Sequence, residues 1–213
     1  KTQDFFEEKK AIFSGNLINL DAEKVEKKKP CSGELDIKIM GGSLGARLIN
    51  KTAPKVFSQL SQDFPDFKFI LSHQCGKGNL EETKSYYDSC KKNFDLKLFE
   101  FVESMESFYS NADLIISRAG ALSVSEICET QNIAIFIPLK NSIDNHQYEN
   151  AKFLAEKNSA FICKEDLLEE NLKIILFEIV KNPEILEKMK KNISRISLTD
   201  KKNMIVKKIL SNE

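Results

Sequence analysis

Leu35-Asp-Ile-Lys-Ile-Met40 and the turn that follows it, Gly41-Gly-Ser-Leu-Gly-Ala46, decide the fold class of this chain. The first segment is a short apolar run that predicts a β-strand, and the glycines of the second end it. The residues that follow place Ile49, Val56 and Leu60 on one face of a helix. A strand, a glycine-rich turn and an amphipathic helix in this order predict the first part of a βαβ unit.

The same alternation continues along the chain. Apolar runs predict five further strands, at residues 67–71, 96–102, 114–117, 133–137 and 160–163. A polar stretch from Asn79 to Lys92 predicts a helix, and apolar stripes predict two final helices over residues 168–179 and 185–193. Strands that alternate with helices of this length predict an open, parallel α/β sheet.

Composition and charge narrow the possible functions. Hydrophobic residues make up 41% of the chain, which favours a packed core over disorder. Lys plus Arg and Asp plus Glu number 32 each, so no net charge draws the chain to nucleic acid, and we expect no nucleic-acid partner. No apolar run approaches the roughly 20 residues that a membrane-spanning helix needs.

The cysteines and the N-terminal segment carry further expectations. The five cysteines include no Cys-x-x-Cys pair, which favours neither a zinc site nor a disulfide framework and is typical of a reducing cytoplasm. The chain begins at Lys1 rather than Met, which predicts a fragment or an excised domain. Residues 21–33 contain the basic run Lys27-Lys-Lys29-Pro30 and predict a solvated linker.

Three segments follow predicted strands, where βα loops and helix N-termini of an open sheet bind ligands. The first is the glycine-rich turn at residues 41–46. Its glycines permit close approach of the backbone to a phosphate, and Ser43 adds a hydroxyl donor. A glycine-rich turn of this kind also serves simply to pack a helix tightly on a strand, and the local pattern leaves both interpretations open.

The second segment is Ser117-Arg-Ala-Gly-Ala-Leu-Ser-Val-Ser-Glu126, after the fourth predicted strand. Glu126 has two interpretations: it binds both hydroxyls of a ribose, or it completes a capping box with Ser123. Arg118 is either a salt-bridge partner or a phosphate contact, and the sequence leaves this choice open.

The third segment runs from Pro138 to Asn150 and is crowded with hydrogen-bonding side chains. The amide of Gln147 suits recognition of sugar hydroxyls, since it offers both a donor and an acceptor. The alternative is a polar cap ahead of the next helix. His146 and His73, the two histidines of the chain, stand in no nucleophile or metal pattern.

Taken together, the three segments resemble the MurG family of glycosyltransferases. Gly-Gly-Ser-x-Gly-Ala-Arg at 41–47, the segment 117–126, and Asp-x-x-Gln-Tyr-x-Asn-Ala at 144–151 occur in the family's order and at similar spacing. His73-Gln-Cys-Gly76 and Glu100-Phe-Val-Glu-Ser-Met105 are similar to two further family stretches. The resemblance runs from about Gly15 to the C-terminus, nearly the whole chain.

The resemblance implies one half of a GT-B glycosyltransferase, a Rossmann-like α/β domain with a parallel sheet and helices on both faces. Residues 1–33 would end the N-terminal domain and form the interdomain linker, and residues 34–213 would be the C-terminal domain that binds UDP-N-acetylglucosamine. The family transfers N-acetylglucosamine to the lipid-linked muramyl-pentapeptide of cell-wall synthesis with inversion. The domain that holds the base, the lipid acceptor and the membrane contact would be absent, so we expect no catalytic residue in this chain.

The resemblance also implies roles for individual residues. The diphosphate would lie near Ser43 and the loop of Gly120, Ala121, Leu122, Ser123, Val124 and Ser125, where backbone amides and the helix dipole take the place of a metal or cofactor. The main chain at Val102 would recognise uracil, Glu126 the ribose and Gln147 the sugar. Gly42, Asn16 and Asn19 are further candidates for contacts with the donor.

One departure concerns the diphosphate. The family has Gly-Asn-Pro-x-Arg where this chain has Gly15-Asn-Leu-Ile-Asn19, so the expected arginine is replaced by an uncharged side chain. We therefore expect weaker donor binding, or partial compensation by Arg118. The alternatives are a different GT-B transferase or a UDP-sugar epimerase of similar architecture, and a non-catalytic nucleotide-sugar-binding fragment.

Overall fold

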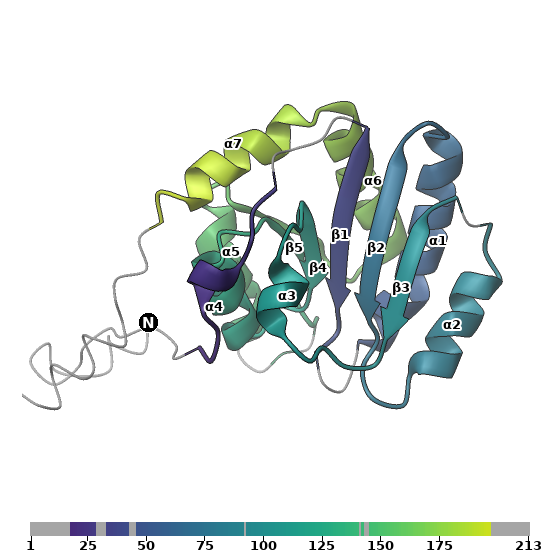
Figure 1. Ribbon diagram of the computed structural model, residues 1–213, viewed down its shortest axis with the longest axis horizontal. Helices are drawn as coiled ribbons and strands as arrows, with labels where there is room; N and C mark the ends of the chain where they lie inside the picture. Colours follow the sequence, from purple (N-terminus) through teal and green to yellow (C-terminus); the bar gives the residue numbers. More distant parts are fainter. Residues whose placement is uncertain are drawn as a thin grey trace, which may run out of the picture.

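The computed structural model describes residues 18–28, 33–42, 46–91, 93–140, 142 and 145–196. Six parallel strands form one sheet in the order β3-β2-β1-β4-β5-β6 (Figure 1). The strands are β1 (Glu34–Met40), β2 (Lys68–Gln74), β3 (Asp95–Phe99), β4 (Leu114–Ser117), β5 (Ala134–Phe136) and β6 (Ala160–Ile162). The open, parallel α/β sheet expected from the sequence is confirmed.

Helices follow the strands on both sides of the sheet. They are α1 (Arg47–Asp63), α2 (Leu80–Asp88), α3 (Met105–Tyr109), α4 (Ala121–Glu129), α5 (His146–Ala155), α6 (Leu168–Lys181) and α7 (Glu184–Ile193), with a short 3-10 helix, η2, at Ala22–Lys24. Two of these, η2 and α3, are too short to produce an apolar stripe and were not expected. In the part of the chain that the structure describes, no helix has the length and apolarity to cross a membrane.

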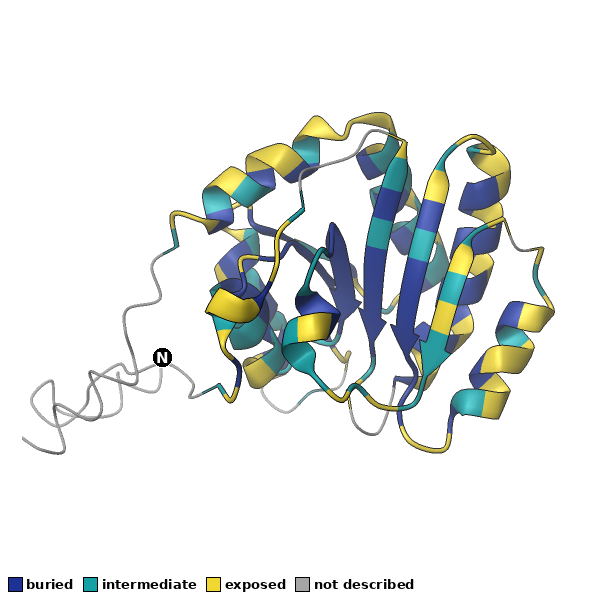
Figure 2. Cartoon of the chain, viewed as in Figure 1, coloured by how far each residue is buried: buried dark blue, intermediate teal, exposed yellow. Residues whose placement is uncertain are grey.

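The sheet separates two hydrophobic cores. Alternate residues of β1, such as Ile37 and Ile39, pack with α1, α6 and α7 on one face. On the other face, Met40 and Ile115 pack with α3, α4 and α5. Figure 2 shows the central strands buried and the outward faces of the helices exposed. Burial on both faces explains why β4 and β5 are continuous apolar runs rather than alternating ones.

The carboxyl ends of the six strands lie in one row. Met40 of β1 is paired with Gln74 of β2 on one side and with Ser117 of β4 on the other. The row continues outward to Phe99 of β3 and to Phe136 of β5, which is paired with Ile162 of β6. The third strand therefore ends at Phe99, short of the expected Val102, because its neighbour β2 ends at Gln74. All βα loops consequently begin at the same edge of the sheet.

The segment at residues 18–28 is part of the domain, so the expectation of a solvated linker is wrong for it. Leu20 and Val25 are each only 6% exposed and belong to the core beside α3 and α4. Lys27 Nζ donates to the carbonyl of Thr130 and to Asn132 Oδ1, 3.1 Å away. Burial lowers the pKa of Lys27 to about 8. A basic run is usually solvated, but here each of its first two lysines has acceptors on the folded domain.

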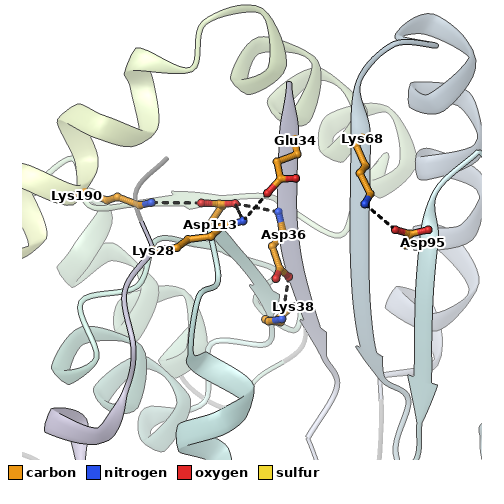
Figure 3. Close-up of polar contacts among 8 residues, drawn as sticks. All are labelled: Lys28, Glu34, Asp36, Lys38, Lys68, Asp95, Asp113 and Lys190. Carbon is orange, nitrogen blue, oxygen red and sulfur yellow. Dashed lines mark hydrogen bonds and ion pairs between the residues drawn. The ribbon is translucent and has the colours of Figure 1, made fainter. Parts of the chain in front are cut away.

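A charge cluster lies at the amino ends of β1 and β4, opposite the row of carboxyl ends. Asp113 accepts from Lys28 Nζ at 2.9 Å and from Lys190 Nζ of α7 at 3.5 Å, and its side chain is 5% exposed (Figure 3). It also accepts the backbone N–H of Asp36 at 3.0 Å. One carboxylate thus joins the N-terminal segment, β1, β4 and the last described helix.

We expect Asp113→Ala to lower the free energy of unfolding by about 2–4 kcal/mol, because it leaves one backbone N–H and two partly buried lysines without their acceptor. Asp95→Ala is the matched control: its ion pair with Lys68 spans two strands at 3.2 Å, but its side chain is 67% exposed. Such a pair contributes about 0.5 kcal/mol. Urea denaturation of both variants measures the difference, and equal losses would contradict the role given to Asp113.

Candidate functional site

The row of strand ends brings together the loops that the sequence singled out. The loop after β1 begins with Gly41 and Gly42, and Gly42 has a φ of +76°, a conformation that favours glycine. Ser43 and Asn16 lie outside the described residues. The loop after β4 leads directly into α4. Because β1 and β4 are neighbours whose connections run to opposite faces of the sheet, these two loops flank its switch point, where open α/β sheets bind ligands.

The first turn of α4 points its backbone N–H groups toward this edge. Gly120 is the N-cap and offers no side chain to cap the turn, which also contains no acidic residue. Ser123 is therefore the third helical residue and not the N-cap, so the predicted capping box of Ser123 and Glu126 is wrong. Gly120 at this position leaves room for an anion beside the helix N-terminus.

Glu126 lies in the middle of α4 and is held by Tyr109 of α3. The Tyr109 hydroxyl donates to Glu126 Oε2 at 2.9 Å and lies 3.6 Å from Met40 Sδ, at the end of β1. Tyr109 is fully buried, whereas Glu126 is only half-buried. The carboxylate is therefore fixed from its buried side, next to the end of β1. No sequence pattern marks Tyr109 as a partner of Glu126, because an aromatic residue at this position is typical of an ordinary core.

The environment of Glu126 favours its neutral form. Burial raises the pKa of Glu126 above its usual value of 4.5, and the negative charge of Glu106 on α3 raises it further. The hydrogen bond from Tyr109 acts in the opposite direction. Ionisable groups with a strongly shifted pKa are found more often at functional sites than elsewhere in a protein.

Arg118 forms a salt bridge within the domain. Its Nη1 lies 2.6 Å from Glu165 Oε1 and donates to the carbonyl of Ile137 at 3.0 Å. The other carboxylate oxygen of Glu165 accepts the N–H of Lys140. Arg118 thus ties the loop after β4 to the loops after β5 and β6. Of the two interpretations left open by the sequence, the structure favours the salt bridge.

Gln147 and Asn150 of α5 hold neighbouring loops at the same edge. Gln147 is 9% exposed, and its Oε1 accepts the N–H of Leu139 at 3.1 Å. Asn150 Nδ2 donates to the carbonyl of Ala119 at 3.1 Å, just before the N-cap of α4. Gln147 is therefore both a candidate contact to a sugar and a support for the loop after β5.

Apolar side chains stand beside these polar groups. Val102, in the loop after β3, is half-buried against the core, but its neighbour Phe101 is 69% exposed. Leu122, in the first turn of α4, is 58% exposed, while Val124 is buried. An exposed phenyl ring next to open backbone offers a flat surface on which a planar heterocycle can stack.

The two histidines differ in their surroundings. His73 is fully buried between Tyr87 Oη at 2.9 Å and Asn50 Oδ1 at 3.1 Å. Burial lowers the pKa of His73 to about 3, so the ring is neutral at physiological pH and joins β2 to α1 and α2. His146 is the exposed first residue of α5.

Asn19 is exposed and lies on the side of the sheet covered by α3 and α4. The next residue, Leu20, is buried in that core, and the N–H of Asp21 donates to Glu106 Oε1 at 3.2 Å. Asn19 therefore precedes a segment docked on α3, which begins at Met105, one short loop beyond the end of β3. The position of the missing arginine is thus two residues from a bond to α3, the helix whose Tyr109 holds Glu126.

Comparison with known proteins identifies the family to which this chain belongs. Residues 37–208 match the glycosyltransferase family 28 C-terminal domain, which covers the whole sheet apart from the first three residues of β1. The chain belongs to this family. The match includes every loop of the candidate site except the N-terminal segment that carries Asn19.

Individual relatives agree with the family. The chain is 33% identical over 187 residues to the UDP-N-acetylglucosamine–N-acetylmuramyl-(pentapeptide) pyrophosphoryl-undecaprenol N-acetylglucosamine transferase of Acinetobacter baumannii, covering 84% of this chain and 50% of that protein. It is 36% identical to the enzyme of the same name from Rickettsia bellii, over 85% of this chain and 51% of that one. The resemblance to the MurG family is thus confirmed.

Solved structures show the same fold. The crystal structure of MurG from Acinetobacter baumannii superposes with a TM-score of 0.76 at 34% identity, over 85% of this chain and 51% of that one. A UDP-N-acetylglucosamine 2-epimerase from Neisseria meningitidis reaches a TM-score of 0.55 at 16% identity and shares the fold alone. The chain spans about half the length of the transferases it matches, and its fold is the Rossmann-like half of a GT-B enzyme.

The raised pKa of Glu126 predicts a pH-dependent stability difference. Because the folded state binds this proton more tightly than the unfolded chain, the resulting stabilisation is present below the usual pKa of 4.5 and is lost as pH rises through the raised pKa. We therefore expect Glu126→Gln, which can still accept from Tyr109, to be at least as stable as the parent at pH 8. The advantage should shrink toward pH 4.

Thermal melts across this pH range measure the effect. Glu170→Gln, at an exposed position of α6, is the control for the substitution of a glutamate by glutamine. A Glu126→Gln protein that is less stable than the parent at pH 8 would contradict the environment assigned to this carboxylate.

Proposed function

We propose that this chain is the donor-binding half of a glycosyltransferase of peptidoglycan synthesis, and that its ligand is UDP-N-acetylglucosamine. The observation that carries the proposal is the position of Glu126. A half-buried carboxylate is held by Tyr109 at the switch point of a parallel sheet, although its burial opposes its ionised form. The two hydroxyls of a ribose would supply the donors that favour the ionised form.

The neighbouring loops suit the rest of the donor. The N-terminus of α4, with Gly120 as its N-cap and Ala121 to Ser125 following, would hold the diphosphate together with Gly42 and Ser43. Uracil would bind to the main chain at Val102, with the exposed ring of Phe101 beside it. Gln147 would contact the sugar through its amide. Arg118 would act through its salt bridge to Glu165, keeping these loops in place.

The reaction would be the inverting transfer of N-acetylglucosamine to a hydroxyl of undecaprenyl-pyrophosphoryl-N-acetylmuramyl-pentapeptide. The match to the relatives whose names describe this acceptor covers only about half of each relative's length. The base and the acceptor site would therefore lie in the N-terminal domain of the full-length enzyme. In this division, the chain described here binds the donor and stabilises the UDP leaving group, and the complete enzyme acts on the cytoplasmic face of the membrane.

We expect the chain to bind UDP and UDP-N-acetylglucosamine and to transfer no sugar by itself. Isothermal titration measures binding, and an assay with a lipid-linked acceptor measures transfer. Binding of several UDP-sugars with equal affinity would favour a different UDP-sugar enzyme of this architecture. Absence of UDP binding would refute the proposal, and sugar transfer by this chain would refute the division between the two domains.

Glu126→Gln should weaken UDP binding about tenfold to a hundredfold, which corresponds to roughly 1.5–3 kcal/mol for hydrogen bonds to a charged group. The loss should require the ribose hydroxyls, so 2′,3′-dideoxyuridine diphosphate should bind the parent and the variant equally. Glu129→Gln, one turn further along α4, is the matched control. Equal weakening of both ligands would mean that Glu126 does not bind the ribose.

Asn19→Arg restores the residue that the family resemblance implies near the diphosphate. A guanidinium there should strengthen UDP binding by about 1.5–3 kcal/mol, or roughly tenfold to a hundredfold, through a charged contact. The gain should be smaller for uridine, which has no phosphate, and should shrink at high salt. Titrations of both ligands at two salt concentrations test this. Unaltered UDP affinity would mean that residue 19 does not face the diphosphate.

A further inference from the structure

The side chain of Gln74 joins two loops of the candidate site. Gln74 is the last residue of β2 and is only 4% exposed. Its Nε2 donates to the carbonyl of Gly42, in the loop after β1, at 2.9 Å. The same nitrogen donates to the carbonyl of Glu100, in the loop after β3, also at 2.9 Å. A primary amide nitrogen has two N–H groups, so both donors of Gln74 are used.

The position of β2 explains why this residue reaches both loops. β2 lies between β1 and β3, and Gln74 is paired with Met40 on one side and with Phe99 on the other. The chain leaves the sheet on both sides just beyond these partners. An amide placed there can contact both departing loops, because neighbouring strands are only about 4.8 Å apart.

The two loops are otherwise held differently. Glu100 has a second anchor, since its Oε1 accepts the N–H of Gly78 at 2.6 Å, and the preceding carbonyl, of Phe99, accepts the N–H of Cys75 at 2.9 Å. Gly42, by contrast, has a φ of +76° and is exposed, and the backbone bond that precedes it, from the N–H of Gly41 to the carbonyl of Gln74, is longer at 3.3 Å. Among the described residues, the side chain that contacts the carbonyl of Gly42 is that of Gln74.

We infer that Gln74 is a positioning residue that sets the distance between the loop for the diphosphate and the loop for uracil. This inference rests on the proposed function, in which Gly42 contacts the diphosphate and Val102 contacts uracil. Gln74 itself would touch neither group. A fixed distance between the loops lets one ligand contact both at once, so the second contact requires no further ordering of the protein.

The test compares ligands that use one loop or both. Gln74→Met keeps the length and volume of the side chain but removes both donors. It should weaken UDP about tenfold, because UDP must contact both loops. It should weaken uridine less than about twofold, since the loop after β3 keeps its bonds to Gly78 and Cys75.

Two further variants distinguish the loss of the Gln74 bonds from a general loss of stability. Gln62→Met removes a comparable amide on α1, bonded to the carbonyl of Ser58 at 2.8 Å and remote from both loops, and should alter neither affinity. Gln74→Asn keeps an amide that is too short to span the two carbonyls, and should reproduce the selective loss for UDP if the methionine variant does not fold.

Each outcome decides the matter. Selective weakening of UDP supports the inference, whereas equal weakening of UDP and uridine, or no change in either, overturns it. If the parent protein binds no UDP, the proposed function is refuted. If the parent and Gln74→Met bind UDP equally well, only the inference about Gln74 is refuted.

Discussion

The alignment of the six strand ends is the constraint on which the rest of the site depends. Parallel pairing in register places Phe99, Gln74, Met40, Ser117, Phe136 and Ile162 along one edge. Every βα loop then starts from the same line, so segments separated by dozens of residues in the chain become neighbours. The side chains that join these loops, Gln74, Arg118 and Asn150, all act within a few ångströms of this line.

The two ends of the sheet have different electrostatic characters. At the amino ends, Asp113 receives two lysines and a backbone N–H, so a buried charge is matched by its partners. At the carboxyl ends, Glu126 is half-buried, is opposed by the charge of Glu106 and receives the hydroxyl of Tyr109. The first arrangement stabilises the fold, and the second leaves a carboxylate whose charge a ligand can satisfy. This contrast is what distinguishes a structural cluster from a candidate binding site.

Hydrogen bonds between loops, rather than the loops' own sequences, define the shape of the site. Arg118 illustrates this, because its guanidinium is used by Glu165 and the carbonyl of Ile137. Gln147 likewise supports the N–H of Leu139 while facing the same edge. A residue in such a position influences a ligand through the loop it holds as well as through any direct contact, so substitutions there affect geometry and binding together.

Local sequence patterns account for the periodic elements and for the chemistry available to the site. Apolar runs and glycine-rich turns were enough to predict six parallel strands, since burial on both faces leaves a local signal, and the order of motifs was enough to predict the family. The tertiary structure alone decided the strand order, the partner of Glu126 and the use of Arg118. It also showed that Lys27 donates to Thr130 and Asn132 and that Lys28 pairs with Asp113. These contacts join residues far apart in the chain, and a pattern read over a short window carries no information about which distant acceptor a side chain will meet.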